Sequence, residues 1–213
     1  MDFTAETVWA CAVAADRIND GYLKEDQWQV TGQDTSVPLK KANKQMVKAW
    51  LRDTNYSHLI EDDYSKGREI RDYFKGFLFR AINGQCSDFE KEALRIAQKE
   101  TFTGRDMLDF AIVSCLPSVM LRDQAKTEMN REIRYSTQLS GNEGDKVQGE
   151  IEIISCFYSQ AYEKYKIKAK LLDSFVDFWY NKNMEKGQRV VIKAKIKSQR
   201  DNNTTQLNYV KVT

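Results

Sequence analysis

Two kinds of hydrophobic pattern divide the chain. In the first part, apolar side chains recur every three or four positions, which is typical of amphipathic helices. In the last part they alternate with polar side chains, which is typical of half-buried strands. The stretch STQLSGNEGDK between them is rich in Ser, Gly, Asn and Asp and has no apolar period. The sequence therefore predicts an α+β protein with a helical domain in residues 1–135, a linker in 136–145 and a β-domain in 146–213.

Periodic segments predict a bundle of about five helices in the helical domain. Gly21 follows the first segment as a stop signal, Pro38 suits the first turn of the second, and Gly84 ends the third. Trp9, Trp28 and Trp50 are assigned to the helical core or to an interface. Two segments carry broad apolar stripes, formed by Leu39, Ala42, Met46, Ala49 and Trp50 in the second, and by Ile70, Tyr73, Phe74, Phe77, Leu78 and Ile82 in the third.

The last two predicted helices have sharper boundary signals. Ser87 and Glu90 form an S-x-x-E capping box ahead of the fourth helix, in which each side chain accepts a hydrogen bond from a backbone amide of the first turn. The fifth helix starts near Arg105. Pro117 should end or kink it after Leu116, because proline has no amide hydrogen to continue the helical ladder.

Five strands are expected in the β-domain. Lysines occupy alternate positions in the second and fourth strands, opposite Tyr, Ile, Ala, Val and Leu side chains. Asn202 lies in a polar turn, DNN, between the last two strands. Five short strands in so small a domain cannot bury a core as a flat sheet, so we expect a closed five-stranded barrel. The predicted strands are residues 146–155, 163–172, 174–180, 188–199 and 204–213.

Charge is distributed unevenly along the chain, which has 33 Lys and Arg against 31 Asp and Glu. Residues 145–213 carry 13 basic and 8 acidic side chains (+5), which leaves 20 and 23 (−3) for residues 1–144. No apolar run approaches the roughly 20 residues that span a bilayer, and the first residues lack the pattern of a signal peptide. We therefore expect no membrane partner and a cytoplasmic location, in the host cytoplasm if the protein is viral.

Few catalytic arrangements are open to this sequence. With one histidine, His58, every His-dependent triad or metal site would rest on a single loop residue. The four cysteines are scattered without a C-x-x-C and are interpreted as free, mostly buried thiols. Residues 61–63 are three consecutive acids whose side chains diverge, which favours an acidic loop over a metal site, and no phosphate-binding glycine loop is present. We expect no enzyme activity, no catalytic or metal-binding residue and no cofactor.

The predicted β-domain resembles the oligonucleotide-binding (OB) barrel family. The resemblance rests on five strands, the aromatic third strand FVDFWY, the turn EKGQR entering the long fourth strand RVVIKAKIKSQ, and the closing hairpin into QLNYVKV. The piece from FWYNKNMEKGQ onward looks like the carboxy-terminal half of OB domains in small tailed-phage proteins. The resemblance as a whole covers about a third of the chain and implies a domain for single-stranded nucleic acid. Only NKNM separates the third and fourth strands, where many OB folds carry a helix.

Independent of that resemblance, the lysine rows fit a phosphate backbone. Neutralising phosphates releases counterions and gives salt-sensitive, sequence-tolerant affinity. The alternative is that such rows keep the outer face of a sheet hydrated and protect its edges. Glu150 and Glu152 are expected to form cross-strand ion pairs with Lys166 and Lys168. The candidates for phosphate contacts are Lys166 and Lys168 on the second strand, and Lys193, Lys195, Lys197 and Arg200 on the fourth.

Aromatic side chains supply the second ingredient of single-strand binding, a surface on which bases stack. The β-domain has too many of them for one inward face, since neighbours in a strand point in opposite directions. If Val176 and Phe178 fill the core, Phe175 and Trp179 face outward; in the reverse arrangement Phe178 and Tyr180 do. For each of these aromatic side chains, the alternative is burial against the helical domain. The candidates for stacking are Phe175, Trp179, Tyr180 and Tyr209.

Two hypotheses from different classes follow. The first is a non-enzymatic protein that binds single-stranded DNA or RNA through its barrel, as a phage replication or recombination accessory protein. The second is a protein-interaction module that docks a phage or host partner without nucleic acid. A metal-dependent nuclease is disfavoured by the lack of His and of a clean acidic cluster. A partner or self-association surface is expected on the helical domain, because RDYFKGFLFRAI concentrates Phe and Leu and places Phe79 off the stripe.

Overall fold

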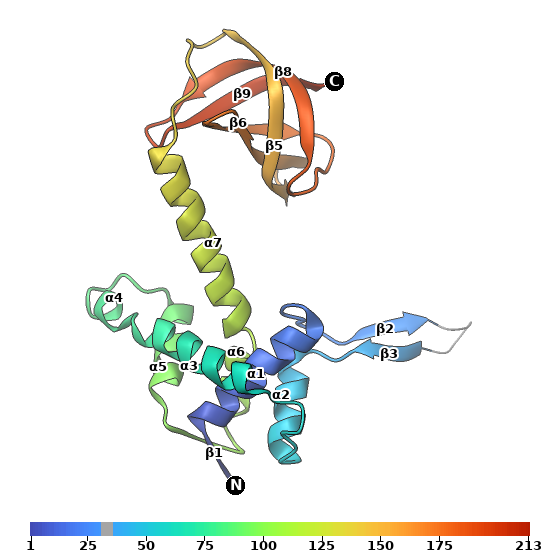
Figure 1. Cartoon of the computed structure of the whole chain (residues 1–213), viewed down its shortest axis with the longest axis vertical. Helices are drawn as coiled ribbons and strands as arrows, with labels where there is room; N and C mark the ends of the chain where they lie inside the picture. The colour runs from blue at the N-terminus through green and yellow to red at the C-terminus, as the bar shows by residue number, and fades with distance from the viewer. Residues whose placement is uncertain (31–35) are drawn as a thin grey trace. The chain divides into compact units, whose positions relative to one another are not determined.

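The structure is a computed structural model that describes residues 1–30 and 36–213. It contains two compact units, Met1–Gln124 and Ala125–Thr213, and the division falls within the helix α7, Leu116–Tyr135. The first unit is mainly helical, and the second contains a closed five-stranded barrel (Figure 1). The predicted α+β class, a helical region followed by an OB-like barrel, is therefore confirmed.

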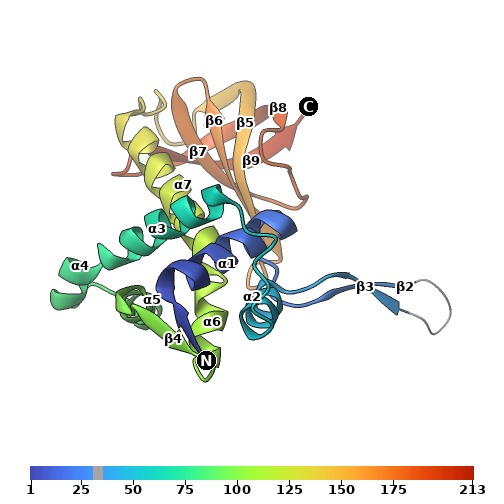
Figure 2. The ribbon, with the colours of Figure 1, turned by 60° about the horizontal axis from the view of Figure 1, so that its bottom comes forward.

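The helical unit is built around α1, Ala5–Asn19, in which ten of fifteen residues are buried. The helices α2, Asn43–Arg52, and α3, Glu61–Lys75, pack against it (Figure 2). Gly67 of α3 lies so close that an added Cβ would come within 3.1 Å of the Ala10 backbone nitrogen. This unit also contains β1 (Asp2–Thr4), α4 (Leu78–Ile82), α5 (Asp88–Gln98), β4 (Thr101–Thr103) and α6 (Met107–Val113).

Each predicted helical segment contains a helix, but the prediction for Pro38 is wrong. Pro38 lies in β3, Ser36–Lys40, which pairs with β2, Gln27–Val30, in a hairpin that extends away from the helices of its unit (Figure 2). Both strands of such a hairpin are edges, where a residue without an amide hydrogen is tolerated. Leu39 and Trp28 are exposed there and belong to no core stripe, whereas Trp9 is buried and Trp50 packs on the core.

Pro117 starts a helix instead of ending one. The helix α6 ends at Val113, and Pro117 lies in the first turn of α7, where a missing amide hydrogen costs no helical bond. The predicted third helix is divided at Gly76 and Phe77 into α3 and the short α4, which leaves Ile82 exposed.

The capping box ahead of α5 is confirmed. The Glu90 amide donates to Ser87 Oγ at 3.3 Å, and the Ser87 amide donates to Glu90 Oε2 at 2.7 Å. Helix starts of this kind depend on neighbouring residues alone, which is why the sequence predicts them well.

The strand pattern of the barrel is also confirmed. The strands follow the order β5-β6-β7-β9-β8, and β8 closes the ring by pairing with β5. All neighbours are antiparallel except β7 and β9, which are parallel. The predicted turn at 201–203 connects β8 to β9. The strands are β5 (Lys146–Ser159), β6 (Lys164–Leu171), β7 (Ser174–Tyr180), β8 (Arg189–Gln199) and β9 (Thr204–Val212).

The strand β5 serves two neighbours and thereby closes the barrel. Its first half pairs with β8 and its second half with β6, with a register shift between Ile153 and Ser155. Gly149 lies where a Cβ would come within 2.7 Å of Leu171 Cδ1, so a larger residue there would require the Leu171 side chain to shift. The predicted alternation holds, since the core consists largely of the alternate apolar residues of these strands, among them Ile151, Ile153, Ile167, Ala169, Val176, Phe178, Ile192, Ala194, Ile196 and Leu207.

Candidate functional site

The third barrel strand, β7, directs its aromatic side chains to both faces. Val176 and Phe178 lie in the core, and Tyr180 packs against it. Phe175 and Trp179 therefore lie on the outer face, as in the first of the two predicted arrangements. Only Trp179 is partly open to solvent, because Phe175 is 3% exposed. The ammonium of Lys170 lies 5.9 Å from the centroid of the Phe175 ring.

An aromatic cluster surrounds Trp179 on the outside of the barrel. Phe157 of β5 pairs in register with Lys166 of β6, which pairs with Trp179, so the three side chains lie in one row across the sheet. Tyr162, in the β5–β6 turn, has its ring centroid 4.8 Å from that of Trp179. Phe157 and Tyr162 are 69% and 66% exposed. We call Phe157, Tyr162, Lys166 and Trp179, with Asp177 beneath them, the aromatic face.

Asp177 is a buried carboxylate within this face. Its side chain is 1% exposed and forms ion pairs with Lys166 and with Arg200, whose Nη2 lies 3.3 Å from Asp177 Oδ2. Neither carboxylate oxygen has a partner of good hydrogen-bond geometry, so the contacts are ionic. A buried charge is tolerated only when it is compensated. The single negative charge of Asp177 thus balances one of the two positive charges of Lys166 and Arg200 inside the protein.

Lysines on the other side of the barrel have no such partner. Lys195 of β8 pairs in register with Lys146 of β5 and with Asn208 of β9. Lys193 pairs with Gln148 and with Lys211. Within the described residues, no carboxylate lies within 4.0 Å of the ammonium groups of these lysines. We call Lys146, Lys193, Lys195 and Lys211, together with Tyr209, the lysine face.

Strand order separates the two faces. The strand β9 lies between β7 and β8, so the β8 lysines are not direct neighbours of Trp179. Lys168 lies opposite Asp177 in β7 and Ser155 in β5, but forms no ion pair among the described residues. Lys197 is exposed on β8 beside a register shift.

Tyr209 has an unusual backbone for an aromatic residue. Its φ is 52°, in the left-handed region, and its side chain is 76% exposed. Such a conformation costs on the order of 1–3 kcal/mol for a residue with a side chain. The Lys195 ammonium lies 5.8 Å from the centroid of the Tyr209 ring. The strained backbone therefore holds an aromatic ring in solvent beside a lysine.

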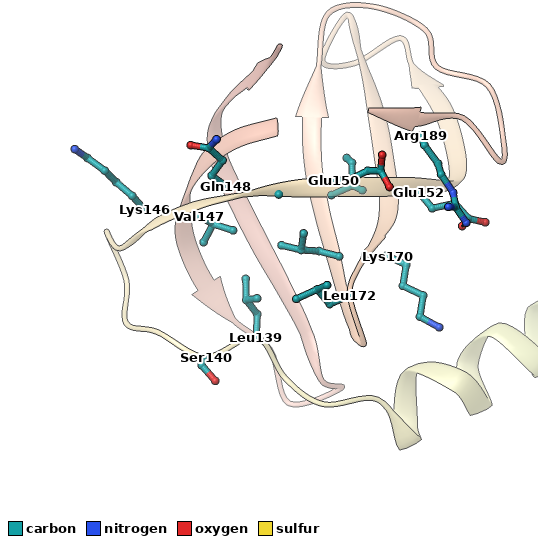
Figure 3. A pocket seen from close by; sticks show the side chains of 13 residues that line it. Leu139, Ser140, Lys146, Val147, Gln148, Glu150, Glu152, Lys170, Leu172 and Arg189 are labelled. Atoms are coloured by element: carbon teal, nitrogen blue, oxygen red, sulfur yellow. The ribbon is translucent and has the colours of Figure 1, made fainter. Parts of the chain in front are cut away.

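A hollow of about 630 Å³ opens at the start of β5 (Figure 3). Leu139 and Leu172 contribute apolar surface, and Glu152 forms an ion pair of 3.1 Å with Arg189 at its edge. The predicted ion pairs of Glu152 and Glu150 with Lys166 and Lys168 are thus wrong, because the register places Glu152 opposite Arg189 and Lys170. Lys146 borders the hollow, but its side chain extends away from it.

Part of the predicted linker is held against the barrel. The Gln199 side-chain amide donates to the carbonyl oxygens of Leu139 and Gly141, each at 2.9 Å. Asn203, in the β8–β9 turn, donates to the carbonyl oxygen of Arg134 at 3.0 Å. These contacts lie within the second unit and cover one end of the barrel.

The single histidine is a packed residue. The rings of His58 and Trp50 have centroids 3.6 Å apart, and His58 Nε2 has no hydrogen-bond partner within the described residues. Burial lowers the pKa of His58, which favours the neutral ring. As predicted, the residue lies in a loop.

The acidic run 61–63 is the first turn of α3, not a loop as predicted. Burial raises the pKa of Asp63. Hydrogen bonds donated by Arg17 and by the Ile60 amide lower this pKa by more, so the net pKa lies below its usual range. Asp63 Oδ2 lies 2.8 Å from Arg17 Nη2. Acids favour a helix start because they compensate its positive dipole end, so a structural role explains the run.

Comparisons add no relative to this picture. The chain matches no protein-family model, no curated protein and no solved structure at a significant level. Among the described residues, no helix is long and apolar enough to cross a membrane, and no group of three or more His, Cys, Asp or Glu side chains could hold a metal ion.

Sequence reasoning missed several residues of both faces. Phe157 lies just beyond the predicted end of β5, where continued alternation from Ile153 would have placed it inward, and the register shift between Ile153 and Ser155 turns it outward. Asp177 stands alone in an apolar run at an outward position, which is a signal of a compensated charge. Lys146 and Lys211 become candidates only once the strand order is known.

Proposed function

We propose that this protein is a non-enzymatic binder of single-stranded nucleic acid, and that the aromatic face is where bases stack. The observation that carries the proposal is the tilted contact of the Tyr162 and Trp179 rings, flanked by exposed Phe157, on the outside of an OB-like barrel. Barrels of this architecture bind oligonucleotides on the face of their second and third strands and on the loop between the first and second. Here those elements are β6, β7 and the β5–β6 turn.

Stacking and charge supply different parts of the affinity. A base on an aromatic ring contributes roughly 1–3 kcal/mol, whatever its identity. The lysines of the outer surface attract phosphates and add a contribution that falls with salt. A role as a phage replication or recombination accessory protein is the finer part of the proposal, and its support is the resemblance of the β7–β9 sequence to small phage OB domains.

The proposal is tested by the anisotropy of a labelled oligo(dT) titrated with the full chain at low salt. The Trp179→Ala variant should bind about 5- to 150-fold more weakly, which corresponds to the loss of one stacking platform. The salt dependence should stay unchanged, because no phosphate contact is removed. The matched control is Trp28→Ala, which removes an exposed tryptophan from the β2–β3 hairpin and should bind like the parent. No binding by the parent at low salt, or equal binding by Trp179→Ala, contradicts the proposal.

The second candidate function, docking of a protein partner or self-association, is favoured by the surface of α4. Phe79 and Ile82 are 74% and 73% exposed, and Leu78 is 48% exposed, which gathers three large apolar side chains on one short helix. For self-association, sedimentation velocity should show a larger species at high concentration that Phe79→Glu removes. A monomer at every concentration, unchanged by Phe79→Glu, contradicts the self-association version.

A further inference from the structure

Tyr209 is the extra residue of a β-bulge. Lys195 faces Asn208, and Lys193 faces Lys211, so Tyr209 and Val210 together oppose the single residue Ala194. Val210 packs toward the core, whereas Tyr209 takes the left-handed conformation and is mostly exposed. The bulge thus keeps the strand's inner face intact while it holds one aromatic ring outside. Bulges commonly redirect a side chain in this way near functional sites.

Protection of strand edges does not account for the two lysines of β8. An edge strand carries lysines to prevent pairing with other chains. Lys193 and Lys195 each have a partner residue on both neighbouring strands, β5 and β9, so they lie at no free edge. Among the described residues no carboxylate lies within 4.0 Å of the ammonium groups of the lysine face, so the charge beside the exposed Tyr209 ring complements a polyanion.

The two faces are connected across β9. Asp177 of β7 pairs with Gln206 of β9, the last pair of these two parallel strands, and Trp179 and Asn208 each lie two residues beyond that pair. Asn208 faces Lys195, and Lys195 faces Lys146. Because paired strands lie about 4.8 Å apart, β7 and β8 are roughly 10 Å apart at the level of Gln206, which pairs with Asp177 on one side and with Ser198 on the other. A nucleic-acid strand that leaves Trp179 would cross β9 to reach the lysine face.

We infer that the lysine face is a second base-binding site, with Tyr209 as its stacking residue, and that one strand of nucleic acid occupies both faces by crossing β9. Lys146, Lys193, Lys195 and Lys211 hold the phosphates on either side of the base stacked on Tyr209. The inference rests on the proposed function and extends it from one stacking site to a path.

The test compares a short and a long oligo(dT), of about 4 and about 16 nucleotides, which are the limits of site size for one OB barrel. Tyr209→Gly should weaken binding of the long oligonucleotide about 5- to 150-fold and change binding of the short one little, because the aromatic face alone can hold the short one. Its thermal stability should not fall, because glycine adopts the left-handed conformation without strain. Tyr209→Asn, which also tolerates that conformation, should repeat the binding result, and Tyr209→Phe should bind like the parent.

The matched control is Tyr135→Gly, which removes a tyrosine of equal exposure, 78%, from the end of α7. Equal affinity of parent and Tyr209→Gly for both lengths overturns the second site. An equal loss for both lengths overturns the crossing path, because Tyr209 would then share one site with Trp179. If Trp179→Ala weakens binding and Tyr209→Gly does not, only the inference fails. If the parent binds neither oligonucleotide, the proposed function fails with it.

Discussion

The aromatic face and the lysine face of the same barrel differ in whether their cations are paired with a carboxylate. On the aromatic face, Lys166 is 22% exposed and pairs with Asp177, which also pairs with Arg200. On the lysine face, no carboxylate within the described residues approaches Lys146, Lys193, Lys195 or Lys211 within 4.0 Å. The number of lysines in a strand therefore does not give the uncompensated positive charge that a ligand would meet at the surface. One buried acid separates a surface suited to stacking from a surface suited to phosphates.

The same acid organises the rings above it. Lys166 is held by Asp177 and has its ammonium 5.1 Å from the centroid of the Trp179 ring, so the ion pair and the cation–π contact share one side chain. Because the ion pair already restricts its side chain, Lys166 loses less conformational freedom on contacting the Trp179 ring than an unpaired lysine would. Asp177 thereby helps to orient Trp179 while it reduces the attraction of the face for phosphates.

The largest expected change to this contrast comes from Asp177→Asn. Removing the carboxylate frees Lys166 and Arg200 for phosphates, so affinity for oligo(dT) at low salt should rise. The slope of log K against log salt should steepen by about 0.7, or one single-strand contact, because the substitution removes one negative charge. Binding isotherms over a range of salt concentrations measure this slope, and thermal unfolding checks that the variant is folded.

The matched control is Glu152→Gln, which removes a carboxylate from the exposed pair with Arg189 at the hollow, away from both faces. It should leave the salt slope unchanged and lower the free energy of unfolding by at most about 1 kcal/mol. A slope that steepens equally in both variants would mean that net charge alone, and not the location of Asp177, sets the salt dependence.

The difference between two lysine variants is a smaller effect and distinguishes the two sets of lysines directly. Lys195→Gln should reduce the salt slope by about 0.7, because a free ammonium is lost from the lysine face. Lys166→Gln should reduce the slope by less, since Asp177 compensates part of the charge of Lys166. Salt titrations of the two single variants test this. A larger reduction for Lys166→Gln than for Lys195→Gln would reverse the assignment of the faces.

The sequence predicts those parts of this molecule that depend on neighbouring residues. The alternation of Ile167 and Ala169 with Lys166 and Lys168, and the capping box at Ser87, are local patterns that the structure repeats. Prolines are ambiguous because the same missing amide hydrogen suits a helix start and an edge strand, so Pro38 and Pro117 were placed wrongly.

The candidate site was less predictable because it depends on strand order. The alternation in β8 indicates that Lys193 and Lys195 face outward, but it does not reveal that β9 lies between them and β7. The bulge at Tyr209 depends on the register between β8 and β9, which no short sequence window contains. The pairing of Asp177 with Arg200 likewise joins residues that are distant in the sequence.

The double pairing of β5 has a consequence for the order in which the barrel folds. The residues of the aromatic face from Phe157 to Trp179 belong to successive antiparallel strands, whose contacts close short loops. The lysine face requires Lys146 to meet Lys195, about fifty positions away, and the entropy of closing that loop must be overcome first. During refolding we therefore expect the stacking surface to form early and the electrostatic surface last. The rate-limiting step should be the docking of β8 onto the first half of β5.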